Sequence, residues 1–180
     1  MPTDSEALNQ QVVHEAIDHW NRGDLAQYLR LYADNVIIHG YAGLEPGLAN
    51  VRRFYETWWR AFPGSQLIVD DAIAADDKVA CRFRMEGKHE GLFEGIPPSG
   101  RPVSVVGFTI LRFVEGKCAE RWSLVDSVGL LTQMGYLAGL SRPPNNRLRP
   151  TRGRRDDEPL RLRQHVLTAV AADERCERLS

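Results

Sequence analysis

The sequence has little cysteine and shows no metal or nucleotide signature. Its 180 residues include 3 cysteines, and Cys81, Cys118 and Cys176 are too far apart to suggest pairs. Isolated cysteines in odd number argue against a disulfide framework, and a reducing cytoplasm is the simplest compartment for such a chain. The 5 histidines form no HxH, HExxH or Cys–His spacing, and the chain has neither a phosphate-binding loop nor a GxGxxG motif. We therefore expect no metal ion and no other cofactor.

Long apolar runs and a strong net charge are also missing. No apolar run approaches the roughly 20 residues that span a bilayer, and the N-terminal MPTDSEALNQ lacks the basic and apolar regions of a signal peptide. The formal net charge is −1, and the basic excess lies in residues 141–180, with 10 arginines against 6 acidic residues. The remainder is mildly acidic, which gives no reason to expect nucleic acid. We expect neither a membrane nor nucleic acid as a partner.

Hydrophobic periodicity predicts helices followed by strands. Apolar residues at three- and four-residue steps predict the helices, and a period-two pattern from Gln66 onward predicts the strands. The expected elements are helices Ser5–Trp20, Leu25–Tyr32, Leu48–Phe62 and Ser127–Leu137, and strands Val36–His39, Gln66–Ala75, Val79–Lys88, Pro102–Phe113 and Cys118–Val125. This order predicts an α+β fold in which three N-terminal helices pack on a strongly curved antiparallel sheet and enclose a pocket.

Composition divides the chain near residue 140. Residues 141–158 are rich in proline, arginine and asparagine and have no apolar periodicity, so we expect a linker without fixed structure. Residues 160–179 have helical character. We therefore predict one domain at 1–140, followed by an Arg/Pro-rich linker and a C-terminal helical segment at 141–180.

The last expected strand carries the first candidate for chemistry. Alternation places Cys118, Glu120, Trp122, Leu124 and Asp126 on one face. An indole and a leucine between two acids favour a cavity over bulk water. Asp126 could then serve as a general base, if the pocket raises its pKa by desolvation. Equally, Asp126 could cap the helix that begins near Ser127, because aspartate is a favoured N-cap.

Charged and imidazole side chains could assist an aspartate base. Arg112, one strand away, could supply fixed positive charge to an enolate, although an ion pair with Glu120 or exposure to solvent is the slightly favoured alternative. His39 and His89 could shuttle a proton or hydrogen-bond a substrate carbonyl. For each histidine, a structural hydrogen bond is the competing interpretation.

Aromatic side chains could bind a flat ring system. The candidates are Trp58, Phe93, Phe108 and Trp122, together with Trp59. Aromatic residues at these spacings are also typical of an ordinary core. The substrate-binding hypothesis therefore depends on where the sheet places them.

Two motifs resemble those of a known family. Residues 87–101, GKHEGLFEGIPPSGR, and residues 115–135, EGKCAERWSLVDSVGLLTQMG, are similar to the SnoaL-like polyketide (ester) cyclase family. The resemblance covers roughly Leu8–Leu137. It implies the nuclear-transport-factor-2-like cone and a cofactor-free intramolecular aldol condensation of an aromatic polyketide ester. It also implies that Asp126 acts as the acid–base residue, and that two copies pack through the open face of the sheet into a homodimer.

The sequence departs from the family pattern in ways that leave other functions open. Arg112 stands where the characterised cyclases carry a histidine, and Lys88 replaces a threonine before His89. The ligand expected from the resemblance is a small hydrophobic or aromatic polyketide-like compound, and an enzyme is the favoured interpretation. The alternatives are an isomerase or an epoxide-hydrolase-type enzyme in the same cone, and a non-catalytic module for small-molecule binding or dimerisation.

Overall fold

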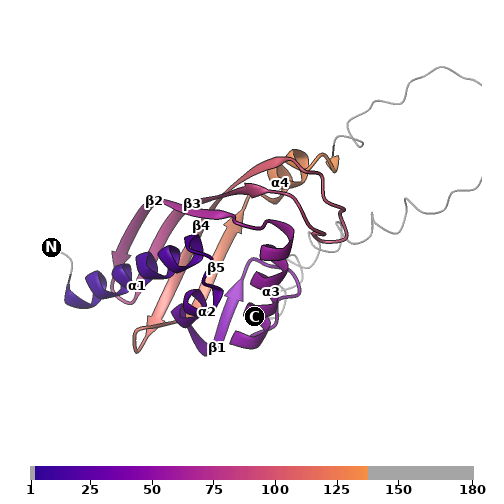
Figure 1. Ribbon diagram of the computed structural model, residues 1–180. Coiled ribbons are helices and arrows are strands. Elements are labelled where there is room, and N and C mark those ends of the chain that lie inside the picture. Colours follow the sequence, from indigo (N-terminus) through magenta and orange to yellow (C-terminus); the bar gives the residue numbers. More distant parts are fainter. Residues whose placement is uncertain (1–2, 138–180) are drawn as a thin grey trace, which may run out of the picture. The chain divides into compact units, whose positions relative to one another are not determined.

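The computed structural model describes residues 3–137, and its strands form one curved, open sheet (Figure 1). The strands are β1 Tyr32–His39, β2 Gln66–Ala75, β3 Lys78–Lys88, β4 Pro102–Val114 and β5 Lys117–Val125. They lie in the order β1-β5-β4-β3-β2. All neighbours are antiparallel except β1 and β5, which are parallel. The expected α+β class is confirmed, and the parallel edge pair is its one departure from the predicted antiparallel sheet.

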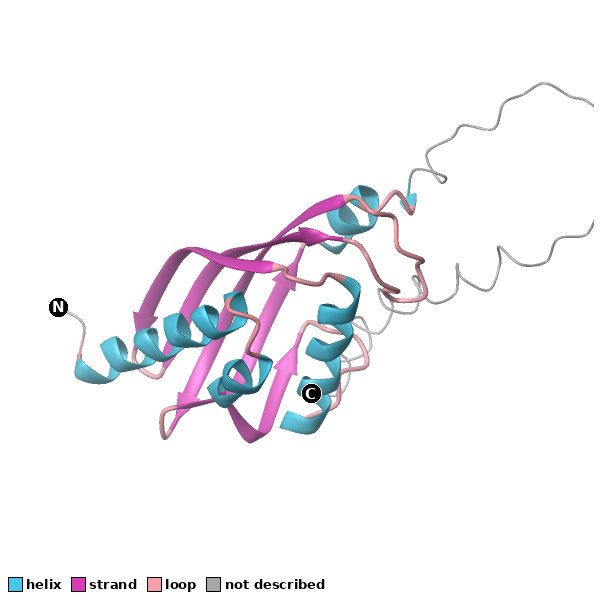
Figure 2. Cartoon of the chain, in the orientation of Figure 1, coloured by secondary structure: helices cyan, strands magenta, loops and turns pink. Residues whose placement is uncertain are grey.

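Helices cover one side of this sheet, as Figure 2 shows. They are α1 Asp4–Asn21, α2 Leu25–Tyr28 with the 3₁₀ turn η1 Leu29–Leu31, α3 Leu48–Ala61, and α4 Ser127–Gln133 at the end of β5. The second helix is shorter than predicted, because Tyr32 pairs with Cys118 of β5 and so belongs to a strand. The predicted linker and helical segment at 141–180 lie outside the described residues.

Helix α1 is fixed to the sheet by its apolar stripe and by polar contacts at its end. Thr3 and Glu6 form a capping box at its start. The indole Nε1 of Trp20 donates to the carbonyl oxygen of Ser65 at 3.0 Å. The side chain of Asn21 bonds both the N–H and the carbonyl of Leu67, at 2.7 and 2.9 Å. The helix therefore forms a wall above the inner face of β2.

A β-bulge divides β5 into two parts. Arg112 pairs with Glu120, whereas the next residue of β4, Phe113, pairs with Cys118, so Ala119 is an extra residue. Cys118 and Arg121 consequently both face the helices and are buried. Cys118 does not share a face with Glu120, and the predicted alternation across the whole strand is wrong for this reason.

The buried apolar residues form two clusters. The larger lies between the helices and the inner face of the sheet and includes Trp20, Tyr28 and Tyr55. The smaller lies where α3 ends, between the 89–101 loop, the start of β4 and α4, and includes Phe62 and Leu130. A candidate site inside the sheet therefore belongs to the larger cluster.

Candidate functional site

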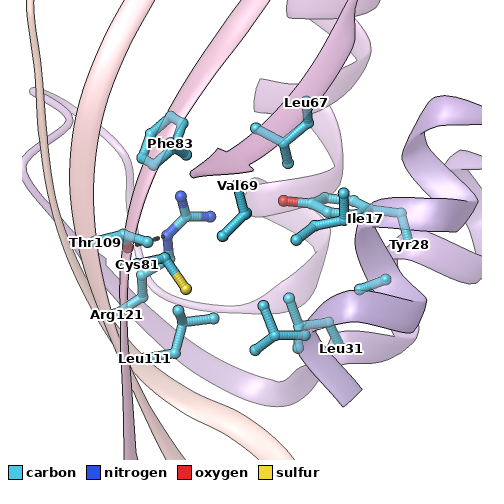
Figure 3. A pocket seen from close by; sticks show the side chains of 12 residues that line it. Ile17, Tyr28, Leu31, Leu67, Val69, Cys81, Phe83, Thr109, Leu111 and Arg121 are labelled. Atoms are coloured by element: carbon cyan, nitrogen blue, oxygen red, sulfur yellow. Dashed lines mark hydrogen bonds between the residues drawn. The ribbon is translucent and has the colours of Figure 1, made fainter. Parts of the chain in front are cut away.

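A small cavity lies inside the curve of the sheet, under α1. Its volume is about 30 Å³, which is the space of about one water molecule. Apolar side chains make most of its wall, and the residues that line it are Val13, Ala16, Ile17, Tyr28, Leu31, Leu67, Val69, Cys81, Phe83, Thr109, Leu111 and Arg121. Figure 3 shows the guanidinium of Arg121 standing among these side chains. The hollow is much smaller than a typical pocket for a drug-sized ligand.

Four hydroxyl groups hold the guanidinium of Arg121. Its Nε donates to Thr109 Oγ1 at 2.8 Å and to Ser123 Oγ at 2.9 Å. Its Nη1 donates to the hydroxyls of Tyr32 and Tyr55, each at 2.7 Å. These contacts join β4, β5, β1 and α3 around one charge. They leave the Nη2 donors of Arg121 without a hydrogen bond to any residue within 3–137.

The tyrosines form a hydrogen-bonded row behind the arginine. The hydroxyl of Tyr32 lies 2.9 Å from that of Tyr55 and 3.1 Å from that of Tyr28. Burial raises the pKa of Tyr32 and of Tyr55, so both phenols are neutral at physiological pH. The row therefore orients the guanidinium without neutralising it.

Arg121 is a buried cation without a carboxylate partner. Its exposed fraction is 7%, and no ion pair joins it to an acidic residue in the described part of the chain. Burial disfavours its charged form, but the surrounding tyrosine oxygens hold the pKa of Arg121 above its usual range. Removing an ion from water costs several kcal/mol per charge even in relaxed proteins, and hydroxyl dipoles offset this only in part. The cavity thus has one positive wall.

The described lining of the cavity offers few groups for acid–base chemistry. Cys81 lines it, but burial raises the pKa of this thiol to about 11. Among the residues described, no carboxylate and no imidazole contributes to the wall. The geometry can therefore bind and polarise an oxygen atom, but it supplies no proton acceptor at neutral pH.

Asp126 lies outside this cavity. It is exposed and caps α4, with Oδ1 accepting from the Gly129 N–H at 2.8 Å. The alternative prediction, that Asp126 caps the helix beginning at Ser127, is confirmed. The expectation that the face of Trp122, Leu124 and Asp126 lines a cavity is wrong, because this face points away from the helices and Leu124 is 75% exposed.

Arg112 does not lie beside Asp126 either. It pairs with Glu120 across β4 and β5, whereas Asp126 follows Val125, which pairs with Gly107. Val125 lies five positions after Glu120, or about 17 Å along the strand at the usual rise. This spacing does not favour the hypothesis that Arg112 assists an Asp126 base, and the alternative ion pair with Glu120 is present, at 3.0 Å between Nη2 and Oε2.

The remaining candidates on the outer face form a small polar cluster. Glu120 bonds Arg112 through Oε2 and His39 Nε2 through Oε1, the latter at 2.9 Å. The hydrogen bond from His39 and then that from Arg112 lower the pKa of Glu120. His39 stacks on Trp122, with ring centroids 5.5 Å apart. This cluster brings four predicted site residues together, but outside the cavity.

His89 is a structural histidine in the described fold. It is fully buried, and its Nδ1 accepts from the backbone N–H of Ser99 at 3.2 Å. Burial lowers its pKa. Its Nε2 is a buried nitrogen without a partner in the described residues, and Phe62 lies 5.3 Å away between ring centroids. His89 therefore pins the 89–101 loop and does not reach the cavity.

The predicted aromatic clasp is divided between two places. Trp58 and Phe93 contact each other at 5.5 Å between centroids and pack on the smaller cluster. Phe108 is on the outer face and is 61% exposed. None of these three lines the cavity. For Phe108 the reason is that periodicity separates the two faces of a strand but does not say which face the helices cover, whereas Trp58 of α3 and Phe93 of the 89–101 loop belong to the other cluster.

Arg121 is the residue that sequence reasoning missed. The sequence places it with Ser123 on the strand face opposite to Trp122, and an arginine in such a strand gives no sign of burial. The helices cover that side of the sheet, and the tyrosines of β1 and α3 meet Arg121 there. Only the tertiary fold brings these hydroxyls to the guanidinium.

Other kinds of site find little support in the described residues. Within 3–137, no group of three or more histidine, cysteine, aspartate or glutamate side chains could hold a metal ion. The helices in that range are too short or too polar to cross a membrane. A second hollow, of about 380 Å³, lies on the surface beside Arg30, Arg52 and Lys117. Its lining includes the buried Tyr32, but its charged side chains are all exposed.

Comparisons with known proteins place this fold in a family. The family model described as SnoaL-like polyketide cyclase matches residues 10–134. AclR from Streptomyces galilaeus, named as a proposed hydroxylase, is 30% identical, with a TM-score of 0.65 over 72% of this chain and 97% of its own. A search of curated proteins finds no match.

Two further solved structures show the same relationship. TsrD from Streptomyces laurentii is 27% identical, with a TM-score of 0.68 over 76% of this chain and 100% of its own. IdmH from Streptomyces antibioticus, named as a proposed polyketide cyclase, is 28% identical, with a TM-score of 0.61 over 71% of this chain and 98% of its own. The chain belongs to the SnoaL-like polyketide cyclase family, and its fold is the nuclear-transport-factor-2-like cone that the motifs implied.

Proposed function

We propose that this chain is a cofactor-independent enzyme that closes a ring in a polyketide-like carbonyl ester by intramolecular aldol condensation. The observation that carries the proposal is the apolar cavity inside the cone, whose one charged lining residue among those described is Arg121. Family membership supports a cyclase or hydroxylase type of function on small polyketide-like ligands. Apolar walls suit the hydrocarbon part of such a ligand, and the guanidinium suits a carbonyl oxygen.

The proposed chemistry needs a stabilised enolate. A proton leaves the carbon between two carbonyls, the resulting carbanion attacks a second carbonyl carbon, and the new alkoxide takes up a proton. A fixed positive charge next to the enolate oxygen lowers the barrier of the first step, because it is already oriented when the negative charge develops. Arg121 takes the role that the sequence assigned to Arg112, whose charge is paired with Glu120.

The acid–base residue is a separate proposal. The family motif places it at Asp126, whose Oδ2 makes no hydrogen bond within the described residues. Asp126 follows the last residue of β5 and lies five positions after Arg121, or about 17 Å between α-carbons. They cannot contact the same small carbonyl unit at once. Catalysis by Asp126 therefore requires that the substrate extends from the cavity to the end of β5, or that the chemistry occurs there.

Substrate entry requires that the cavity opens. A volume of about 30 Å³ accommodates one oxygen-sized group and not a ring system. Val13, Ala16 and Ile17 of α1 line one side. We expect the α1 wall to yield when ligand binds, with ring protons of the ligand close to these three side chains.

Conversion of a linear 1,3-dicarbonyl methyl ester with a tethered ketone tests the proposed function. Cyclised product, separated by chromatography and identified by mass, should form faster with the protein than in buffer. Asp126→Asn should abolish the acceleration if Asp126 is the base, while an asparagine still caps α4. An undiminished rate in that variant removes Asp126 from the mechanism. No acceleration by the wild-type chain with this ester and its shorter homologues rejects the cyclase proposal.

Ligand binding without turnover is the second candidate function. The specific observation in its favour is that no carboxylate or imidazole lines the described cavity. A polycyclic phenol that binds and is recovered unchanged after hours, while no ester is cyclised, would support it. The isomerase and epoxide-hydrolase alternatives need an acid–base group in the lining of the cavity. The described lining has no carboxylate or imidazole for this role.

We further propose that the outer face of the sheet joins two copies into a homodimer. The large apolar side chains Val106, Phe108, Ile110, Trp122 and Leu124 are exposed there. Phe108→Asp with Leu124→Asp should shift the sedimentation coefficient to that of a monomer. Leu8→Glu on α1, also exposed, should not. The cytoplasm remains the proposed compartment, and the free thiols of Cys81 and Cys118 are compatible with it.

A further inference from the structure

We infer that the Arg121 cavity binds its ligand as an enolate anion, formed from a small 1,3-dicarbonyl compound that releases its proton to solvent on binding. The charged oxygen contacts Nη2 of Arg121. The inference rests on the proposed function in one respect, since both place the ligand in the same cavity. It adds the charge state of the bound species and the residue that selects it.

The free donors of Arg121 define the contact. A guanidinium carries five N–H groups. The Nε group is shared by Thr109 and Ser123, and Nη1 uses Tyr32 and Tyr55. Nη2 has no such partner in the described chain, and Arg121 lines the cavity. The two N–H donors of Nη2, which diverge from one nitrogen, are thus left, and one of them can point at an oxygen that enters the cavity.

The charge balance points to an anion rather than a neutral carbonyl. No carboxylate within 3–137 pairs with Arg121. The neighbouring phenols stay neutral, because burial raises the pKa of Tyr32 and of Tyr55. Cys81 in the wall stays a thiol for the same reason. The described residues therefore supply no negative charge here, and an anionic ligand is attracted by a buried cation that is screened less than one in water.

The lining of the Arg121 cavity also indicates where the carbon-bound proton of the ligand goes. No group in the described lining accepts a proton at neutral pH. A carbon acid between two carbonyls is acidic enough to exchange its proton with water, and the cation favours the ionised form on binding. One C–H bond breaks, its electron pair stays on the ligand as the enolate, and the proton leaves as buffer-bound H⁺. No oxidant, metal or protein base takes part in this step.

Acetylacetone is a suitable probe, because its enolate and its neutral forms have different ultraviolet spectra and it has no tethered ketone to close a ring. We expect the full-length protein to bind it with the enolate spectrum below the pKa of the free compound. Binding should release about one proton per ligand, measured with a pH indicator in weak buffer. The apparent affinity should rise about tenfold per pH unit below the ligand's pKa.

Variants connect the anion to Arg121. Arg121→Met should weaken binding about thirtyfold or more and abolish proton release. Arg112→Met, which removes a paired cation on the outer face, should leave both unchanged. If Arg121→Met does not fold, Thr109→Val, which removes one Nε acceptor and leaves the charge in place, should keep proton release and change only the affinity.

Three outcomes overturn the inference. They are binding with the neutral spectrum, binding whose affinity is flat with pH, and absence of binding at millimolar acetylacetone. None depends on turnover. An enolate that binds as expected, in a protein that cyclises no ester, rejects the aldol proposal and leaves this inference standing.

Discussion

The Nη1 atom of Arg121 lies 2.7 Å from the hydroxyl of Tyr55, so a charge on β5 is held directly by α3. Hydrogen bonds to charged groups contribute about 1.5–3 kcal/mol. Tyr55→Phe removes this acceptor and also the partner of the Tyr32 hydroxyl. We expect it to lower the free energy of unfolding by about 2 kcal/mol, measured by urea denaturation.

Tyr136→Phe is the matched control for that measurement. Tyr136 packs on the smaller cluster and makes no side-chain hydrogen bond within the described residues. Its loss of a hydroxyl should change the unfolding free energy by less than about 0.5 kcal/mol. Equal effects of the two substitutions would contradict a special role of Tyr55.

His89 should make the fold sensitive to mildly acidic pH. Burial lowers the pKa of His89 below its ordinary value of 6.5, so the folded chain favours the neutral ring. Protonation would also place an N–H where Nδ1 now accepts from Ser99. The stability from the neutral ring is fully present above pH 6.5 and is lost as pH falls through the lowered folded value.

Urea midpoints at about pH 7.5 and about pH 5.5 check this dependence. The wild type should lose stability between them, and His89→Gln should lose less. His14→Gln, on the exposed side of α1, should behave as the wild type. A wild-type midpoint that does not fall over this range would show that His89 titrates normally.

Gly40 is required by the approach of β1 to β5. A β-carbon at this position would lie 1.8 Å from the carbonyl oxygen of Ser123, and the residue also has a φ of +93°. Gly40→Ala should cost more than about 3 kcal/mol and disturb Ser123 next to the guanidinium. Gly43→Ala separates the two causes, because Gly43 has a φ of +75° with nothing within 4 Å. It should cost about 1 kcal/mol.

Asp126 should show its capping role in stability alone. Asp126→Ala removes the acceptor for the Gly129 N–H and should cost about 1 kcal/mol in thermal or urea unfolding. Asp126→Asn should stay within a few tenths of a kcal/mol of the wild type, because asparagine caps equally well. A large loss in the asparagine variant would show that the charge itself stabilises the fold.

Local pattern predicted the elements well, because apolar spacing reflects the face that each element buries. The stripe of Val13, Ala16 and Trp20 is buried in α1, and the period-two run at Val79, Cys81 and Phe83 is buried in β3. The motifs predicted the family, which is confirmed. Helix ends were less accurate, as at Tyr32, where pairing with β5 overrides helical spacing.

The site could not be predicted from the same signals. Alternation assigned Trp122 and Arg121 to opposite faces correctly, but it cannot tell which of two faces receives the helices. Trp122 is apolar and reads as interior, although it is 36% exposed. Arg121 is charged and reads as exterior, although it is buried. Two of the four hydroxyls that hold it come from residues 66 and 89 positions away in the chain.

The extra residue at Ala119 acts as a spacer between the guanidinium and one of its supports. Tyr32 pairs with Cys118 on one side of the bulge, and Arg121 lies on the other. A chain without Ala119 would keep Cys118 and Arg121 facing the interior, because the ladder from Glu120 to Cys118 would simply become regular. The deletion would, however, shift the start of β5, with which Tyr32 of β1 pairs, by about one residue rise relative to Arg121, roughly 3.3 Å. This shift is longer than the 2.7 Å hydrogen bond between Arg121 and the Tyr32 hydroxyl. The presence of Ala119, whose methyl side chain takes no part in the site, therefore sets the distance between the guanidinium and Tyr32.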